Sequence, residues 1–283
     1  MLKKLLVVTG FAVTQFFTAS TFAKTDITYY GQAGYKIVTP QGHVIMIDPW
    51  LTNPKNPKGQ EQLNALQKVD LILLTHGHFD HIGNTVEIAK KTGAKLVTNF
   101  DLGKVMVEKL GFPKDQFGYP TTGNIGGQIP LLDGEVKVGF TQAIHSSSVG
   151  VPLADGTETY YGGTVTGLHI QIKDGPSFYH TGDTDVFKDM ELINLFGPVD
   201  IMLAAIGDTF TMGPKRAAHA VKLVQPRKMV IPNHFGTFPL LRGTPEKFAG
   251  FLKEEGVVTP MRVMQVGETI RVEYPSKSLI HKY

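Results

Sequence analysis

The amino-acid sequence predicts an α/β (α+β) fold in which strands come first and strand–helix pairs follow, in both halves of the chain. Residues 69–74 and 201–205 are compact apolar runs of the kind that is buried on both faces of a sheet. Strand and helix patterns then alternate, for example at 95–98 and 102–110. No repeat, linker or low-complexity tract divides the 283 residues, of which 42% are hydrophobic. We therefore expect one domain with a sizeable core.

Turn-forming residues and changes of period define the remaining elements. In the first half, we expect strands at 27–38 and 43–47, a surface loop at 53–59 and a helix at 84–91. In the centre, glycine-rich turns between 123 and 134 separate short segments, and a long loop is expected at 146–163. In the second half, the predicted elements are strands at 168–172, 177–179 and 229–232, and helices at 186–195, 217–223 and 246–255.

Residues 1–23 have the layout of a secretory signal peptide. Lys3 and Lys4 precede a largely apolar stretch at 5–17, and small residues follow up to Ala23. The apolar stretch is too short to span a bilayer comfortably, so we expect no stable membrane anchor after cleavage. An N-terminal strand or core helix would explain neither the two lysines nor the small residues. We expect an exported protein, periplasmic or secreted, whose single domain is 24–283.

Composition limits the chemistry that is available to the chain. A net charge of +3 gives no warrant for nucleic-acid binding, which normally needs a basic patch. The absence of cysteine excludes disulfides, thiolate metal ligands and a cysteine nucleophile. Any metal site must therefore be built from histidine, carboxylate and water.

The run from Thr75 to His81 is the strongest functional signal in the sequence. It places three imidazoles, His76, His78 and His81, and the carboxylate of Asp80 within six residues, directly after a predicted buried strand. Side chains that leave a strand end on a tight loop can converge on one point, whereas along a strand they alternate between faces. Imidazole and carboxylate are ligands suited to zinc and related divalent ions. The segment therefore predicts a metal site.

The pattern His76-x-His78-x-Asp80-His81 resembles the signature of the metallo-β-lactamase fold superfamily. Three further elements of that family follow in family order: His145 after a strand, Asp183 in a Gly-Asp-Thr turn, and His234 near the end of the chain. The resemblance extends from residue 27 to about 272. It implies a four-layer αββα sandwich, with two sheets face to face and helices outside.

The resemblance also implies two divalent metal ions and a division of ligands between them. One ion would be held by His76, His78 and His145, and the second by Asp80, His81 and His234, with Asp183 bridging both. A hydroxide shared between the ions would attack a carbonyl carbon or a phosphorus atom. Asp80 would be the catalytic residue, because it would orient that nucleophile as well as bind metal. Zn²⁺ suits the histidines, while the two aspartates leave Mn²⁺ or Fe²⁺ open.

Four segments resemble a narrower branch of this superfamily, at 30–34, 47–50, 207–214 and 234–239. The branch comprises little-characterised metal-dependent hydrolases related to ascorbate-phosphate lactonases and N-acyl-phosphatidylethanolamine phospholipases. This chain departs from the relatives at two positions: Gln32 often corresponds to histidine and Phe235 to tyrosine. The substrate specificity of those relatives therefore does not transfer.

Three further polar residues lie beside predicted site segments. Asp48 ends a strand at a proline turn, where it could either bond nearby backbone amides or support a metal-binding histidine. Asp208 could support the site or cap the helix that follows it. His180 precedes the Gly-Asp-Thr turn and could be a partner of the metal site or a structural histidine. His43, His169, His219 and His281 have no ligand-like neighbours.

The sequence thus predicts a binuclear metal-dependent hydrolase that acts on a small ester, lactone or phosphoester. One alternative is an activity like that of a phosphodiesterase or phospholipase, and another is a non-catalytic metal-binding protein. The expected partner is a small molecule. The natural substrate, the metal and the oligomeric state do not follow from the sequence.

Overall fold

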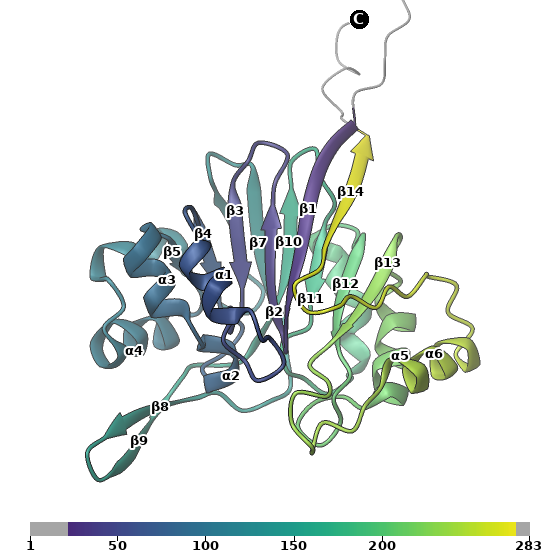
Figure 1. Ribbon diagram of the computed structural model, residues 1–283. Coiled ribbons are helices and arrows are strands. Elements are labelled where there is room, and N and C mark those ends of the chain that lie inside the picture. Colours follow the sequence, from purple (N-terminus) through teal and green to yellow (C-terminus); the bar gives the residue numbers. More distant parts are fainter. Residues whose placement is uncertain (1–21, 276–283) are drawn as a thin grey trace, which may run out of the picture.

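The computed structural model describes residues 22–275 and consists mainly of two six-stranded sheets that pack face to face, with helices on both outer faces (Figure 1). The predicted α/β class and the αββα sandwich are confirmed. In each sheet, antiparallel strands are followed by a parallel group that alternates with helices.

The first sheet contains the N-terminal strands and, at one edge, the last strand of the chain. From β14 to β3 the neighbours are antiparallel, and β3, β4 and β5 are parallel. In sheet order, the strands are β14 (Thr269–Pro275), β1 (Phe22–Gly31), β2 (Gly34–Val38), β3 (Val44–Ile47), β4 (Leu71–Leu73) and β5 (Lys95–Val97).

The second sheet has a parallel group of three strands, β11 to β13, followed by antiparallel strands. In sheet order, the strands are β13 (Met229–Asn233), β12 (Ile201–Ala205), β11 (Phe178–His180), β10 (Thr166–Ile172), β7 (Val136–Gln142) and β6 (Gln128–Leu131). A separate hairpin of β8 (Ser148–Leu153) and β9 (Gly156–Tyr161) extends away from the two sheets (Figure 1).

Helices cover the outer face of each sheet. The first sheet is flanked by α1 (Gly59–Ala65), α3 (Thr85–Thr92) and α4 (Phe100–Leu110), and the short α2 (Phe79–Ile82) lies between β4 and α3. The second sheet is flanked by α5 (Pro214–Val224), α6 (Pro245–Glu254) and a 3₁₀ segment, η3 (Lys188–Phe196). Two further 3₁₀ turns, η1 (Lys114–Gln116) and η2 (Tyr119–Thr121), follow α4.

Strand alternation explains why the central strands are apolar throughout. In β4, Leu71 and Leu73 point into the core between the sheets, whereas Ile72 packs beneath the helices. In β12, Ile201 and Leu203 face the other sheet in the same way, and the intervening side chains pack against α5 and α6. Because successive side chains point to opposite faces, a strand covered on both faces needs apolar residues at every position.

Four predicted elements differ from the structure. The expected strand 27–38 is a hairpin of β1 and β2, because Gly31 and Gln32 have positive φ angles and reverse the chain. The expected loop 146–163 is the β8–β9 hairpin, whose strands are mostly exposed and so lack the alternating apolar pattern. The helix expected at 186–195 is the 3₁₀ segment η3. Helix α1 begins at Gly59, within the expected surface loop.

Most of the predicted leader lies outside the described residues. Its last two residues, Phe22 and Ala23, form the first positions of β1 and pair with Pro275 and Tyr274 of β14. Within residues 22–275, no helix is both long enough and apolar enough to cross a bilayer.

Candidate metal centre

All of the predicted ligands lie where strands of both sheets end. Strands β3, β4, β7, β11, β12 and β13 run in a common direction within their sheets, and the loops after them carry the polar residues. The loop after β4 contributes His76 and His78, and α2 contributes Asp80 and His81. Backbone polar groups are free at strand ends, which is why such edges bear binding sites.

Gly77 permits the tight path of the chain between two of the imidazoles. A Cβ atom at this position would lie 2.7 Å from Val149 Cγ2 and 3.0 Å from Ser148 O. The backbone N–H of Gly77 donates to Ser147 Oγ at 3.2 Å. Strand β8 therefore supports the ligand loop from outside and leaves no room for a side chain between His76 and His78.

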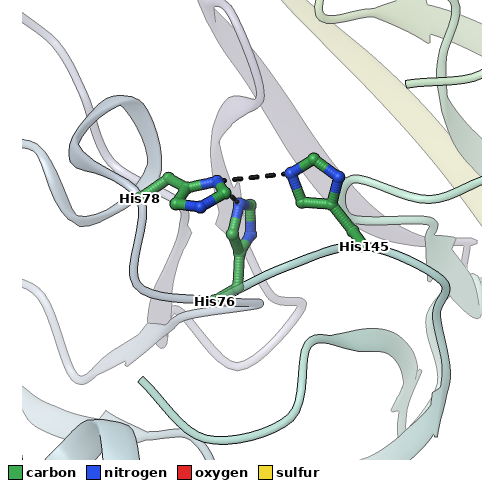
Figure 2. A group of neighbouring side chains, drawn as sticks. All are labelled: His76, His78 and His145. Atoms are coloured by element: carbon green, nitrogen blue, oxygen red, sulfur yellow. Dashed lines mark hydrogen bonds between the residues drawn. The ribbon is translucent and has the colours of Figure 1, made fainter. Parts of the chain in front are cut away.

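The first group of candidate ligands consists of His76, His78 and His145. Figure 2 shows the three rings converging, with His76 and His78 on the loop after β4 and His145 on the loop after β7. His78 Nδ1 lies 3.0 Å from His76 Nε2 and 3.2 Å from His145 Nε2. Burial lowers the pKa of all three imidazoles below the ordinary value. They are therefore held neutral, which is the form that binds a metal ion.

The second group consists of Asp80, His81 and His234. His234 Nε2 lies 3.4 Å from Asp80 Oδ2, and His81 Nε2 lies 3.7 Å from the same oxygen. Burial opposes ionisation of Asp80, but His81 and His234 outweigh it and hold the pKa of this carboxyl below its ordinary value. Burial also opposes protonation of His234, yet the Asp183 and Asp80 carboxylates raise its pKa to about 9.

Asp183 lies between the two groups and contacts members of both. Its Oδ2 is 3.1 Å from His234 Nε2 and 3.6 Å from His145 Nε2, and its Oδ1 is 3.3 Å from His81 Nε2. The side chain is 3% exposed and follows Gly182, whose φ of 58° turns the chain after β11. Because this carboxylate lies beside histidines of both groups, it is suited to contact an ion held by either group.

The donor set fits divalent metal ions. Among the described residues, buried atoms without a hydrogen-bond partner include His81 Nε2, Asp183 Oδ1 and both ring nitrogens of His234. Buried polar atoms are normally paired, so unpaired ones that face each other at a common point indicate a missing partner. Within each group, the candidate ligand atoms of the three residues all lie within 4.8 Å of one another. Neutral imidazole and carboxylate are donors that Zn²⁺ and related ions accept.

Asp48 orients two candidate ligands from behind. It is fully buried, and its Oδ2 lies 2.7 Å from His81 Nδ1. Thr75 donates to the same carboxylate through its backbone N–H at 2.9 Å and its hydroxyl at 2.7 Å. The Thr75 hydroxyl oxygen lies 3.0 Å from His76 Nδ1. Asp48 therefore does both of the things that its position suggested: it accepts a hydrogen bond from a backbone amide, and it holds the ring of His81.

His180 supports the turn that carries Asp183. Its Nε2 lies 3.0 Å from Ala33 O, and its Nδ1 accepts a hydrogen bond from Gly182 N at 3.0 Å. The ring is fully buried, and burial lowers its pKa. Because both nitrogens are engaged, His180 is a structural histidine that ties the β11 turn to the β1–β2 turn.

Asp208 is not joined to the candidate ligands. Its side chain is exposed, and no hydrogen bond or ion pair within residues 22–275 connects it to any of them. Its Oδ1 instead accepts from Thr209 N at 2.9 Å. The N-cap of α5 is Gly213, so Asp208 does not cap this helix either.

Gln32 links two candidate ligands, a role that the sequence did not reveal. Its side-chain amide donates to Asp80 Oδ2 at 2.7 Å, and its backbone carbonyl accepts from His234 N at 2.7 Å. Tyr29 OH donates to the same carbonyl at 3.0 Å. The only signal in the sequence is that Gln32 stands where relatives often have histidine. That difference does not reveal a contact with Asp80, which lies 48 residues further along the chain.

A cleft of about 640 Å³ opens above the candidate ligands. Its polar lining contains Gln32 and all of the candidate ligands except His76 and His81, which are fully buried, and most of its other lining residues are apolar. The lining residues are Gln32, His78, Phe79, Asp80, His145, Ser146, Asp183, Phe210, His234, Phe238, Pro239, Leu240 and Leu241. A cleft with few convergent polar groups and apolar walls is typical of a small-molecule site.

Comparison with known proteins agrees with this geometry. A model of the Beta-lactamase superfamily domain matches residues 43–235. A UPF0173 metal-dependent hydrolase from Thermodesulfovibrio yellowstonii is 56% identical over 254 residues, which are 90% of this chain and 94% of the relative. Another from Myxococcus xanthus is 43% identical over 258 residues, which are 91% and 87% of the two chains.

Among solved structures, the chain is similar to Igni18, described as a novel metallo hydrolase from the hyperthermophilic archaeon Ignicoccus hospitalis. The TM-score is 0.74 at 33% identity, covering 89% of this chain and 99% of that one. All seven candidate ligands, from His76 to His234, lie within residues 43–235, which the family model matches. The chain therefore belongs to the metallo-β-lactamase superfamily and is a metal-dependent hydrolase.

Proposed function

We propose that the enzyme uses two divalent metal ions to hydrolyse a small ester, lactone or phosphoester. His76, His78 and His145 would hold one ion, and Asp80, His81 and His234 the other, with Asp183 between them. The observation that carries this proposal is the position of Asp183, whose carboxylate oxygens lie 3.1 to 3.6 Å from histidines of both groups.

When bound, two such ions lower the pKa of a shared water molecule and polarise the substrate oxygen. The contribution of the protein is to hold its candidate metal ligands in fixed orientations. Asp48 turns His81 so that Nε2 faces the site, and through Thr75 it directs His76 similarly. Gln32 holds Asp80 Oδ2 in place, so that this carboxylate can accept a hydrogen bond from the attacking water.

The apolar walls would exclude bulk water around the reacting atoms. A low local dielectric strengthens electrostatic interactions between the charged floor and the developing negative charge on the substrate. Neither a catalytic serine nor a covalent intermediate with the protein is needed.

Bond type is tested by hydrolysis of a panel of lactones, carboxyl esters, phosphodiesters and a β-lactam, after chelation and again after addition of Zn²⁺ or Mn²⁺. Acyl cleavage releases a carboxylate, whereas phosphoryl cleavage releases a phosphate monoester. The proposal predicts turnover of at least one ester-type substrate that is lost with chelation and restored by metal. Turnover that persists after complete metal removal would refute it.

We also propose that residues 1–23 direct export and are removed after Ala23. Such processing would remove two residues from the start of β1, where Phe22 is 51% exposed and contributes little to the core. N-terminal sequencing of the protein from fractionated cells tests this proposal. A mature N-terminus at Lys24 outside the cytoplasm supports it, and an intact N-terminus in the cytoplasm contradicts it.

A further inference from the structure

Three aromatic side chains meet beside the candidate metal ligands. The Trp50 ring centroid lies 5.6 Å from that of Phe79 and 6.0 Å from that of Phe238, and the last two are 6.3 Å apart. Phe79 stands between His78 and Asp80 in the sequence, yet it is 65% exposed. A group of apolar side chains that is exposed beside a polar centre is the kind of surface that binds a ligand.

Two more exposed apolar side chains line the same cleft. Phe210 is 52% exposed and Leu240 is 46% exposed, and both line the same cleft as Phe79 and Phe238. We name these four residues, Phe79, Phe210, Phe238 and Leu240, the apolar wall. Phe79 begins helix α2, after β4, and the other three residues lie on the loops that follow β12 and β13.

The fold holds part of the wall in place at a local energetic cost. Asp208 and Thr209 precede Phe210 with φ angles of 67° and 59°, which are unfavourable for residues with a Cβ atom. Thr209 Oγ1 donates to Leu240 O at 2.9 Å, so the two loops are joined at the wall. Strained backbone of this kind tends to occur where a side chain must be presented to a ligand.

The lining of the cleft carries no positive charge of its own beyond the candidate metal site. Among residues 22–275, neither lysine nor arginine lines the cleft. Sites that recognise phosphate usually supply arginine, lysine or the N-terminus of a helix. The part of the substrate that lies outside the reacting bond should therefore be uncharged and apolar.

We propose that the apolar wall binds the apolar acyl or alkyl group of a neutral carboxyl ester or lactone, and so selects this class over phosphoesters. This inference rests on the proposed hydrolase function. In the reaction, the oxygen of water bonds to the carbonyl carbon and the C–O ester bond breaks. One proton of the water passes to the departing alkoxide, and the products are a carboxylic acid and an alcohol.

The size of the effect follows from the burial of methylene groups. Full burial of one methylene group raises the binding constant by about fourfold. A methylene that the apolar wall covers on one side only should raise the binding constant by roughly twofold. Binding of a six-carbon group should therefore exceed that of a two-carbon group by about sixteenfold.

Binding is measured directly through Trp50, the only tryptophan in the chain. Hexan-1-ol and ethanol are the probes, and the fluorescence of Trp50 is recorded with and without added metal. We expect hexan-1-ol to change the emission at concentrations about tenfold or more below those that ethanol requires. The difference should shrink in Phe210→Ala and Phe238→Ala and persist in Phe100→Ala, a matched variant of a partly exposed phenylalanine outside this cleft.

Selectivity is measured with p-nitrophenyl acetate, p-nitrophenyl hexanoate and bis(p-nitrophenyl) phosphate on the metal-loaded enzyme. We expect kcat/KM for hexanoate to exceed that for acetate by about sixteenfold, and the ratio to fall toward one in Phe210→Ala and Phe238→Ala. A ratio near one in the unaltered enzyme, a ratio that these variants do not change, or preferred cleavage of the phosphodiester would overturn the inference.

The two measurements separate the inference from the proposed function. Absence of any metal-dependent turnover counts against the hydrolase proposal, whereas the Trp50 titration still decides the role of the wall. A Trp50 response to hexan-1-ol no stronger than that to ethanol overturns the inference even if the enzyme is active.

Discussion

The carboxylate of Asp48 lies 2.7 Å from His81 Nδ1, and both side chains are fully buried. This contact leaves His81 Nε2 facing Asp80 and Asp183, at 3.7 and 3.3 Å from their oxygens. Asp48 lies 33 residues before His81 and directly follows strand β3, whereas His81 follows β4. The parallel pairing of β3 with β4 thus brings the two residues together.

Asp48→Asn should weaken metal binding. The amide would present hydrogen-bond donors to Thr75 and His81, which themselves donate to Asp48 in the native enzyme. Loss of such a support to a ligand typically costs about 10- to 100-fold in metal affinity. Competition with a chromogenic chelator measures the change. Asp208→Asn is the matched control, because Asp208 has no contact with a candidate ligand, and equal affinities for both variants would contradict the role of Asp48.

Asp183→Asn should reduce turnover by about 100-fold or more with little loss of fold, since the neutral side chain weakens any bridge between two ions. Initial rates, metal content and circular dichroism are measured together. His219→Ala is the control: this histidine is exposed, 3.4 Å from Glu255, and its loss should be nearly silent. An unchanged rate at full metal occupancy in Asp183→Asn would remove Asp183 from the ligand set.

Gln32→Asn should lower kcat by about tenfold, because the shorter amide cannot reach Asp80 and one charge-assisted hydrogen bond is lost. Asparagine also tolerates the φ of 51° at this position, so backbone strain does not confuse the result. Gln32→His keeps a donor near Asp80 and should retain more activity. If both variants match the native enzyme in kcat and in metal content, Gln32 does not position Asp80.

His169 should make stability dependent on pH. Burial lowers the pKa of His169 below 6.5 in the folded state. Near and below this pH, the unfolded chain therefore binds more protons at His169 than the folded chain does. The free energy of unfolding should therefore fall as the pH drops below about 6.5. Urea titrations between pH 8 and 5 should show a smaller fall for His169→Leu than for the native protein. Equal pH dependence would contradict this assignment.

The sequence predicts the strands and the ligand residues best where local pattern and covalent spacing decide the outcome. The apolar run at 201–205 is strand β12, and the ends of α4 and α6 are close to their predicted positions. The run His76 to His81 is local, so its convergence follows from a strand end and a tight loop. His145, Asp183 and His234 join it in the structure, as the order of family motifs led us to expect.

Contacts between distant segments could not be predicted in the same way. Gln32 reaches Asp80 because the β1–β2 turn folds over the end of β4, and no periodicity in the sequence encodes this approach. Most residues of the β8–β9 hairpin are exposed, so the hairpin shows no regular apolar alternation, and only the Asp155-Gly156 pair marks its turn. Phe79 and Phe210 belong to a residue type that is usually buried, and no pattern in the sequence marks them as exposed.

Metal stoichiometry measured together with activity tests the central claim most directly. The enzyme is stripped with a chelator, dialysed, and titrated with Zn²⁺ while bound metal per chain and initial rate on an ester substrate are followed. Two ions per chain, with hydrolysis lost on stripping and restored as the ions bind, is the predicted result. An enzyme that binds no metal, or that hydrolyses the substrate equally well after complete removal of metal, would contradict the account.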